Sequence, residues 1–171
     1  MTRDLGRTTI SLAPARITGR CSGTMPPRAA TVRGDLMPTP NHTIVRAYLN
    51  AYNRADWDTL EALLQPDYVH HNNGQALDVA QFRRGAEWFR AGFPDFAITA
   101  VSTVAEGDRI AVRWVAAGTH SFALMGEEPT GRTVTLHGIT EYRIKDGLVA
   151  EDWEAMDEAH LMRQISPTDA G

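Results

Sequence analysis

The chain has 171 residues, of which 43% are apolar, and this suits one domain with a single sizeable core. Its apolar runs are much shorter than a membrane span, and Cys21 is the only cysteine, so the sequence excludes an internal disulfide and a cysteine-based metal cluster. Residues 1–38 hold six arginines against two aspartates, whereas residues 39–171 hold 11 basic and 19 acidic side chains. This acidic body predicts no binding to nucleic acid, and we expect no association with a membrane.

Residues 1–38 are rich in Arg, Thr, Ser, Ala and Pro and lack helical or strand periodicity. This composition predicts a disordered extension. It contains no apolar stretch of signal-peptide length, so we expect a cytoplasmic protein, although an organelle transit peptide also fits the composition. We expect the functional protein to begin at Met37 and its folded domain to span residues 39–167.

Helices dominate the first half of this domain. Apolar residues at helical spacing and candidate caps predict helices over residues 44–52, 56–64 and 78–92. Asp56 is the candidate cap of the second helix, and Asp78 with Gln81 forms a candidate capping box for the third. A short extended piece at residues 67–71 precedes the third helix.

Strands follow. They are predicted at residues 96–105, 109–119, 133–145 and 148–157, with a last short helix at 158–165. Glu106-Gly107-Asp108 and Asp146-Gly147 are the expected hairpin turns. Helices that precede an antiparallel sheet indicate the α+β class, with the helices packed into the concave side of a curved sheet.

The last hairpin carries unusually many ionisable groups. If Asp146-Gly147 is a two-residue turn, Lys145 pairs with Leu148 and the register of the hairpin follows. One face then carries Thr140, Tyr142, Ile144, Val149, Glu151 and Trp153, and the other carries Ile139, Glu141, Arg143, Asp152 and Glu154. Glu151 would lie among apolar and aromatic neighbours, and burial favours the proton affinity that a general acid or base needs.

A series of short blocks in fixed order resembles the SnoaL-like polyketide cyclase family of the nuclear transport factor 2-like superfamily. The blocks are Asp67-Tyr68-Val69-His70-His71-Asn72, Phe93-Pro94-Asp95, Ala105-Glu106-Gly107-Asp108-Arg109, Gly118-Thr119-His120, Thr130-Gly131-Arg132, Gly138-Ile139-Thr140, Asp146-Gly147 and Glu151-Asp152-Trp153. The resemblance covers roughly residues 41–166. It implies a cone-shaped α+β barrel with a deep, mostly apolar pocket, and a cofactor-free intramolecular aldol closure begun by an acidic side chain. Gly126-Glu127-Glu128-Pro129 departs from the family, which usually has an apolar, proline-rich run there.

The resemblance matches the family's catalytic histidine and acid to His137 and Glu151. Glu151 is therefore the expected base, with His137 or His120 orienting it or stabilising an enolate. The hairpin register places His137 off the Glu151 face, unless a bulge at Gly138 rotates it inward. Such a bulge would also bring in Glu154, the reserve candidate.

The expected substrate-binding residues are His71, Tyr52, Trp88, Phe89, Trp114, Tyr142 and Trp153. The tryptophans among them also suit a plain core role. No metal site is expected, because the chain lacks a His-Glu-x-x-His helix and His70 and His71 would point to opposite faces of an extended segment. No cofactor is expected either.

The sequence thus predicts a cyclase-like enzyme that acts on an apolar, carbonyl-bearing small molecule. Two alternatives stay open: an epoxide-opening or hydrolysing enzyme with the same pocket, and a non-catalytic protein that binds a small ligand. Since related proteins commonly dimerise through their sheets, we expect a homodimer.

Overall fold

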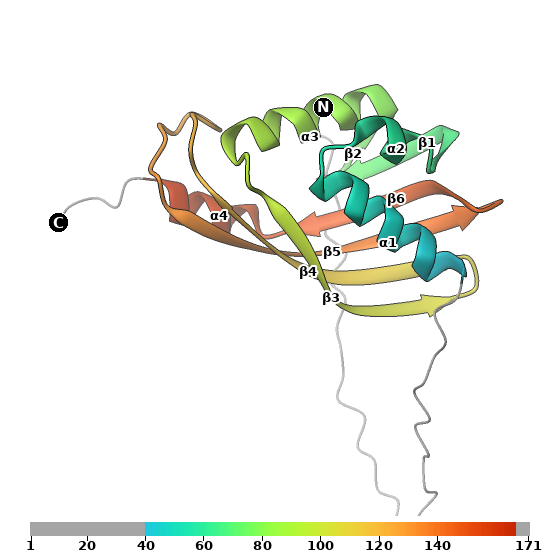
Figure 1. The fold of residues 1–171 in the computed structure, drawn as a ribbon. Helices are drawn as coiled ribbons and strands as arrows, with labels where there is room; N and C mark the ends of the chain where they lie inside the picture. The colour runs from blue at the N-terminus through green and yellow to red at the C-terminus, as the bar shows by residue number, and fades with distance from the viewer. Residues whose placement is uncertain (1–39, 167–171) are drawn as a thin grey trace, which may run out of the picture. The chain divides into compact units, whose positions relative to one another are not determined.

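The computed structural model describes residues 40–166, which form four helices and six strands (Figure 1). In chain order these are α1 (Pro40–Asn53), α2 (Trp57–Glu61), β1 (Leu64–Asn72), β2 (Gln75–Leu77), α3 (Val79–Gly92), β3 (Ala97–Glu106), β4 (Arg109–Thr119), β5 (Thr133–Lys145), β6 (Leu148–Met156) and α4 (Glu158–Ile165). The expectations for residues 1–38 lie outside the described residues. Within residues 40–166, no helix has the length and apolar character needed to span a lipid bilayer.

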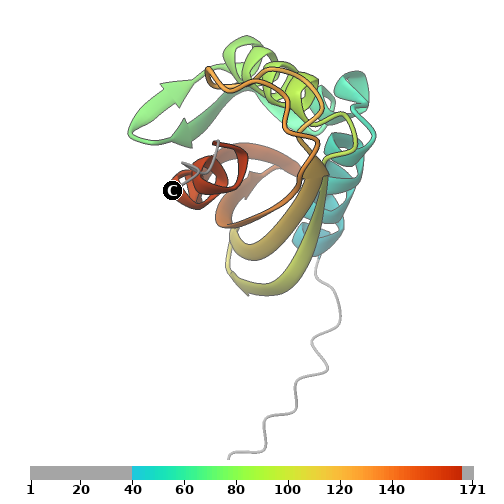
Figure 2. The same ribbon diagram turned by 90° about the vertical axis from the view of Figure 1, so that its left-hand side faces the viewer.

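The six strands of this part form one sheet in the order β2-β1-β6-β5-β4-β3. Neighbouring strands run antiparallel except β1 and β6, which are parallel. The sheet curves, and α1 and α3 lie along its inner side (Figure 2). The predicted α+β class with helices on the concave face is confirmed, and the parallel pair is a departure from the expected antiparallel sheet.

The predicted helix caps are present. Asp78 Oδ1 accepts a hydrogen bond from the Gln81 N–H at 2.7 Å, and the Gln81 side chain accepts one from the Asp78 N–H at 3.0 Å, which completes the capping box of α3. Asp56 caps α2. That helix ends at Glu61, earlier than predicted, because Leu64 already pairs with β6 as the first residue of β1. The three-residue strand β2 has no counterpart among the predicted elements.

A continuous apolar core fills most of the space between the helices and the sheet. Its buried members come from all four helices, from the inner face of the strands and from the connections that follow α3 and β4, and they include Val45, Leu49, Phe82, Val112, Leu136, Val149, Leu161 and Ile165. On β4 and β5 buried and exposed side chains alternate, as expected for a sheet with one covered face. The sheet therefore has a distinct inner and outer face.

The hairpin of β5 and β6 begins as predicted and then changes register. Lys145 pairs with Leu148 and Ile144 with Val149, but Arg143 pairs with Glu151, so Ala150 is an extra residue that forms a β-bulge. Because side chains alternate with a period of two, one extra residue exchanges the faces of everything that follows. Our assignment of residues 151–154 to faces is therefore wrong.

The connection between β4 and β5, residues 120–132, packs against the end of α3. The Ser121 N–H donates to the Gly92 carbonyl at 3.0 Å, and the side chain of Leu124 lies so close to Gly92 that a Cβ there would come within 2.9 Å of it. Both views show this connection, drawn in orange, beside α3 (Figures 1 and 2). This contact places Met125 at the cavity described next.

Candidate active site

A cavity of about 220 Å³ lies between the helices and the inner face of the sheet. Most of its wall is apolar or aromatic. Five of the seven predicted substrate-binding residues line it: Tyr52, Trp88, Phe89, Trp114 and Tyr142. The polar side chains that also reach it include His70, Asn72, Thr140 and Glu154. The cavity thus suits an apolar molecule with a few polar groups.

Glu154, on β6, is a carboxylate in this wall. The bulge at Ala150 turns it to the inner face, opposite Thr140 on β5, whose hydroxyl donates a hydrogen bond to Glu154 Oε2 at 3.2 Å. Loss of solvation raises the pKa of the Glu154 carboxyl, as does the charge of Asp152, and the charge of His70 and the Thr140 hydrogen bond only partly offset this. A raised pKa is what a carboxylate needs to remove a proton from carbon.

Thr140 is itself held from the other side. The Trp114 Nε1–H donates to the Thr140 hydroxyl at 2.9 Å, which leaves the Thr140 proton to face Glu154. Gly138 permits this arrangement, since a Cβ at that position would lie 2.2 Å from the Trp114 ring. The indole therefore packs directly on the β5 backbone.

Next to Glu154, a second polar group is almost completely buried. His70 is 5% exposed and Asp152 is 1% exposed, and His70 Nδ1 lies 2.6 Å from Asp152 Oδ1. The Tyr68 hydroxyl donates to the other carboxylate oxygen at 2.8 Å. Burial lowers the pKa of His70, but the hydrogen bond and charge of Asp152, together with the charge of Glu154, outweigh burial and raise it above its usual value.

His70 and Asp152 were not among the predicted site residues. Tyr68, His70 and Asn72 alternate along β1, and this pattern already placed His70 on the side of the buried Tyr68 and opposite His71. Asp152 could not be found in the same way, because the predicted register assigned it to the outer face. Asn72 also lines the cavity, and its Oδ1 has no hydrogen-bond partner among the described residues.

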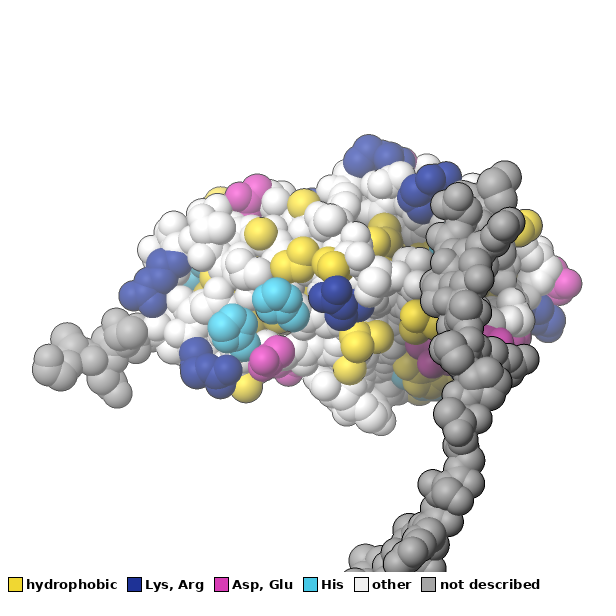
Figure 3. All heavy atoms as spheres, turned by 90° about the horizontal axis from the view of Figure 1, so that it is seen from below, with side chains coloured by type: hydrophobic (Ala, Val, Ile, Leu, Met, Phe, Trp, Pro, Cys, Tyr) yellow, Lys and Arg dark blue, Asp and Glu magenta, His cyan; other side chains and the backbone are white. Residues whose placement is uncertain are grey.

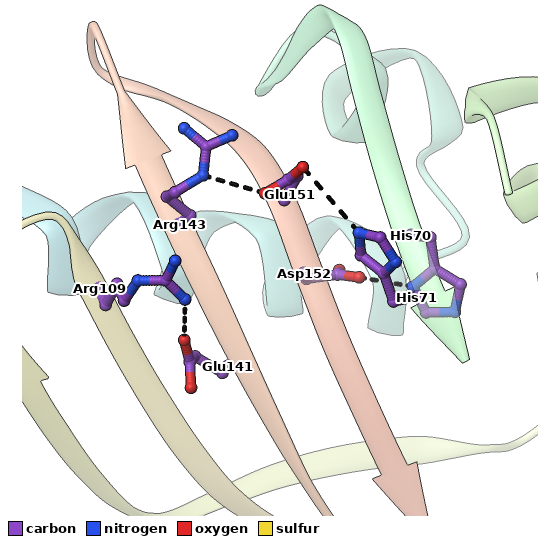
Figure 4. A network of polar contacts seen from close by, with 7 residues as sticks. All are labelled: His70, His71, Arg109, Glu141, Arg143, Glu151 and Asp152. Carbon is purple, nitrogen blue, oxygen red and sulfur yellow. Dashed lines mark hydrogen bonds and ion pairs between the residues drawn. The ribbon is translucent and has the colours of Figure 1, made fainter. Parts of the chain in front are cut away.

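Glu151 lies on the outer face, which corrects its predicted position. It is held by the Arg143 Nε–H, which donates to Glu151 Oε2 at 3.0 Å, and it lies 4.0 Å from His71 (Figure 4). His71 stacks on Trp153 at 5.0 Å, and Arg109 lies over the same indole at 5.0 Å. His71 and Trp153 therefore do not line the cavity, because the bulge and the alternation along β1 turn both outward.

The two other predicted histidines lie away from Glu154. His120 is fully buried where the 120–132 connection begins, with Nδ1 3.2 Å from the Thr130 hydroxyl, and it does not line the cavity. His137 is exposed, 6.5 Å from the ring of His160. The bulge at Gly138 that would have turned His137 inward is absent, since pairing is regular from Gly138 to Arg143. Within residues 40–166, no three His, Cys, Asp or Glu side chains are grouped as metal ligands would be.

Comparison with known proteins identifies the family of this fold. The family model described as SnoaL-like polyketide cyclase matches residues 42–165. The chain belongs to that family. The resemblance inferred from the sequence, and the fold that it implied, are thereby confirmed. No curated protein matches the chain.

Several solved structures are similar to this chain over nearly their whole length. AclR from Streptomyces galilaeus, for which a hydroxylase activity has been suggested, is 29% identical with a TM-score of 0.71, and the match covers 75% of this chain and 97% of AclR. IdmH from Streptomyces antibioticus, for which a polyketide cyclase activity has been suggested, is 30% identical with a TM-score of 0.68, covering 72% and 96%. TsrD from Streptomyces laurentii is 27% identical with a TM-score of 0.67, covering 77% and 98%.

Proposed function

We propose that this protein is a cofactor-free cyclase that closes a ring by an intramolecular aldol-type reaction on an apolar, carbonyl-bearing small molecule. One observation carries the proposal: Glu154 faces an apolar cavity, with a raised pKa and a hydrogen bond that fixes its position. The family supports chemistry of the cyclase type. The suggested activity of IdmH points the same way.

In this proposal Glu154 replaces Glu151 as the base. The Glu154 carboxylate removes a proton from a carbon between two carbonyl groups, and the electron pair moves onto a carbonyl oxygen. The carbon then attacks a second carbonyl of the same molecule, and the new alkoxide receives the proton. A carboxylate with a raised pKa suits this step, because a proton on a carbon between two carbonyl groups is only weakly acidic and needs a stronger base than an ordinary carboxylate.

The aromatic wall would hold the chain of the substrate folded. Tyr52, Trp88 and Trp114 line the cavity from different elements, and flat rings pack well against conjugated carbonyl compounds. The entropy lost in bringing the two reacting carbons of one molecule together is a large part of the barrier to ring closure, and a cavity that holds the substrate folded lowers it. Asn72 Oδ1, which has no partner among the described residues, can accept a hydrogen bond from a hydroxyl of the substrate.

Epoxide opening in the same cavity is the alternative enzyme class. It uses one group to protonate the epoxide oxygen and a carboxylate to activate water. Asp152 faces inward too, but both of its oxygens already accept hydrogen bonds, from Tyr68 and His70. Asp152 therefore has no free oxygen to act as the second carboxylate of that reaction.

The proposed base can be tested without the natural substrate. An apolar β-ketoester in deuterium oxide exchanges its activated C–H, and NMR follows the initial rate after the uncatalysed exchange is subtracted. We expect the native protein to accelerate the exchange and Glu154→Gln to lower that acceleration by about 100-fold or more, the usual contribution of a positioned base. The amide keeps the shape of the side chain, so binding of the ester should persist.

Glu151→Gln is the matched control, because it makes the same change three residues earlier on the outer face. It should leave exchange unchanged. Loss of exchange in Glu151→Gln with normal exchange in Glu154→Gln would contradict the proposal. Binding of the ester with no acceleration in any variant would instead favour a non-catalytic ligand-binding protein.

A further inference from the structure

Three buried side chains, joined in a row by hydrogen bonds, end at the cavity, and the proposed reaction has so far given them no step. Tyr68 donates to Asp152 at 2.8 Å, and Asp152 lies 2.6 Å from Nδ1 of His70, which lines the cavity. Burying a carboxylate and an imidazole together costs solvation, and a well-packed apolar pair would usually be at least as stable. Such a pair next to a cavity is therefore a candidate functional group.

The surroundings of His70 fix its ring in one orientation. Asp152 accepts the Nδ1–H, and the ring of Phe82 on α3 packs against the imidazole at 4.9 Å. When one ring nitrogen is held by a carboxylate, the other nitrogen is the one left to act on a ligand. Nε2 is that nitrogen here.

We propose that His70 is the hydrogen-bond donor that complements the base Glu154: its Nε2–H donates to the carbonyl oxygen that becomes negative, while Asp152 and Tyr68 hold the ring in place. This inference rests on the proposed function and assigns it a second catalytic residue, His70, and two positioning residues. Neither His70 nor Asp152 was expected to act from the sequence.

The step balances without any further reactant. Glu154 takes the proton from carbon, and the electron pair of the broken C–H bond becomes the enolate, whose oxygen accepts the hydrogen bond from His70 Nε2. When the C–C bond forms, the enolate returns to a carbonyl and the attacked carbonyl becomes an alkoxide. The alkoxide takes the proton from Glu154. One C–C bond forms, one proton moves from carbon to oxygen, and nothing is oxidised.

The charges around His70 suit this role. Asp152 and Glu154 face it from β6, and the neutral hydroxyls of Tyr68, Tyr48 and Tyr142 surround the pair from β1, α1 and β5. The two carboxylates raise the pKa of His70 against the opposing effect of burial. His70 and Glu154 also line the same cavity, which places both of them at one substrate.

A binding experiment tests the donor without turnover. 2-Naphthol carries an oxygen like that of an enol, and naphthalene has the same flat shape without it. We expect the native protein to bind 2-naphthol more tightly, and His70→Gln to weaken 2-naphthol by tenfold or more while naphthalene binding stays the same, as measured by fluorescence. Equal losses for both ligands, or no preference for 2-naphthol in the native protein, would overturn the inference.

NMR of ¹⁵N-labelled histidine tests the role of the buried partners. We expect His70 to carry its proton on Nδ1 when neutral and to titrate above about 6.5, the usual value for histidine. Tyr68→Phe removes a hydrogen bond to Asp152 and leaves that carboxylate a stronger acceptor, so the titration point of His70 should rise slightly, whereas Asp152→Asn should lower it clearly. If Asp152→Asn does not fold, Tyr68→Phe still decides the point, because an unchanged titration there would contradict positioning through Asp152.

The exchange assay separates this inference from the function on which it rests. His70→Gln should slow exchange of the β-ketoester by about 100-fold, the effect of removing one oxyanion donor, and should remove the alkaline limb of the pH profile. Loss of exchange in Glu154→Gln with normal rate and pH profile in His70→Gln would refute the role of His70 and leave the base in place. Normal exchange in both variants would refute the proposed function as well.

Discussion

Thr140 on β5 and Glu154 on β6 lie directly opposite each other on the inner face of the sheet, joined by a hydrogen bond of 3.2 Å. The bulge at Ala150 creates this pair, since an even hairpin would have placed Glu154 outside. Thr140 also accepts a hydrogen bond from Trp114. The position of the proposed base thus depends on one extra residue in β6 and one hydroxyl on β5.

Thr140→Val should raise the pKa of Glu154 further, because the Thr140 hydrogen bond lowers it in the native protein. The acid limb of the pH profile for β-ketoester exchange should therefore move to higher pH. The buried Trp114 Nε1–H also loses its acceptor, which should cost about 1–3 kcal/mol of stability in urea unfolding. Thr140→Ser keeps the hydroxyl and should show neither effect; an unmoved acid limb in Thr140→Val would contradict the assignment of Glu154 as the base.

The sequence predicted most of the fold, because helix caps and tight turns are specified by residues that are neighbours in the chain. The capping box at Asp78, the turn at Asp146-Gly147 and the last helix after Asp157 each depend on neighbouring residues. The bulge depends on distant ones. Near the turn, the Val149 N–H donates to the Leu63 carbonyl at 2.8 Å and the Ile144 N–H donates to the Asp108 carbonyl at 2.7 Å. These contacts come from the residues just before β1 and just before β4; they hold the end of the hairpin, and no pattern within residues 133–157 contains them.

The extra residue at Ala150 explains why the predicted positions of Glu151, Trp153 and Glu154 were wrong. The aromatic wall was predicted from residue types, and five of its members line the cavity. Whether Glu151 or Glu154 faces the cavity depends on the register of β5 with β6. The pairing of His70 with Asp152 depends on that register and also on the parallel contact of β1 with β6. The chemical type of each residue is known from the sequence, whereas its partner on a strand distant in the chain is not.

Gly138→Ala and Gly85→Ala should change stability in opposite directions. A Cβ at Gly138 would lie 2.2 Å from the buried Trp114 ring, so the indole must move away from Thr140, and we expect a loss of about 1–3 kcal/mol. Gly85 lies within α3, and beyond its own helix backbone and chain neighbours nothing comes within 4 Å of the place that a methyl group would take. Alanine there should add about 0.5–1 kcal/mol through helix propensity. Urea unfolding measures both, and a stable Gly138→Ala variant would contradict the close packing of Trp114 on β5.

We propose that the outer face of the sheet forms a homodimer. The bulge revises its composition: Ile139, Glu141 and Arg143 lie there beside Glu151 and Trp153, in place of Asp152 and Glu154. Opposite charges alternate on it, and Ile139 is 51% exposed. Hydrophobic, acidic, basic and histidine side chains are also interspersed on the surface seen from below (Figure 3). Such a mixed surface suits a self-complementary contact with twofold symmetry.

Light scattering at micromolar concentration tests the dimer. Ile139→Arg should convert it to a monomer by placing a charge at the centre of the contact. Phe122→Arg is the control, since it also replaces an exposed apolar side chain but lies in the connection between β4 and β5. A native protein that is monomeric across this range, or a dimer that survives Ile139→Arg, would refute this interface.

Glu154→Gln should make the protein more stable at neutral pH although it slows the exchange of the β-ketoester. The folded-state pKa of Glu154 is raised above that of the unfolded chain, which is about 4.3, so between these two values the folded state binds more protons. Stability then falls as pH rises through this window, and above it the full cost of ionising Glu154 remains. The positive charge of His70 reduces this cost without reversing its direction.

Glutamine cannot ionise, so the stability of the variant should match that of the native protein near pH 4 and exceed it increasingly towards pH 8. Urea unfolding at several pH values measures the difference. Glu151→Gln is the control: it loses the partly exposed contacts with Arg143 and His71 and should change stability by less than about 1 kcal/mol. A Glu154→Gln advantage that is the same at pH 4 and pH 8, or absent at both, would show that the cavity does not disfavour the charged carboxylate.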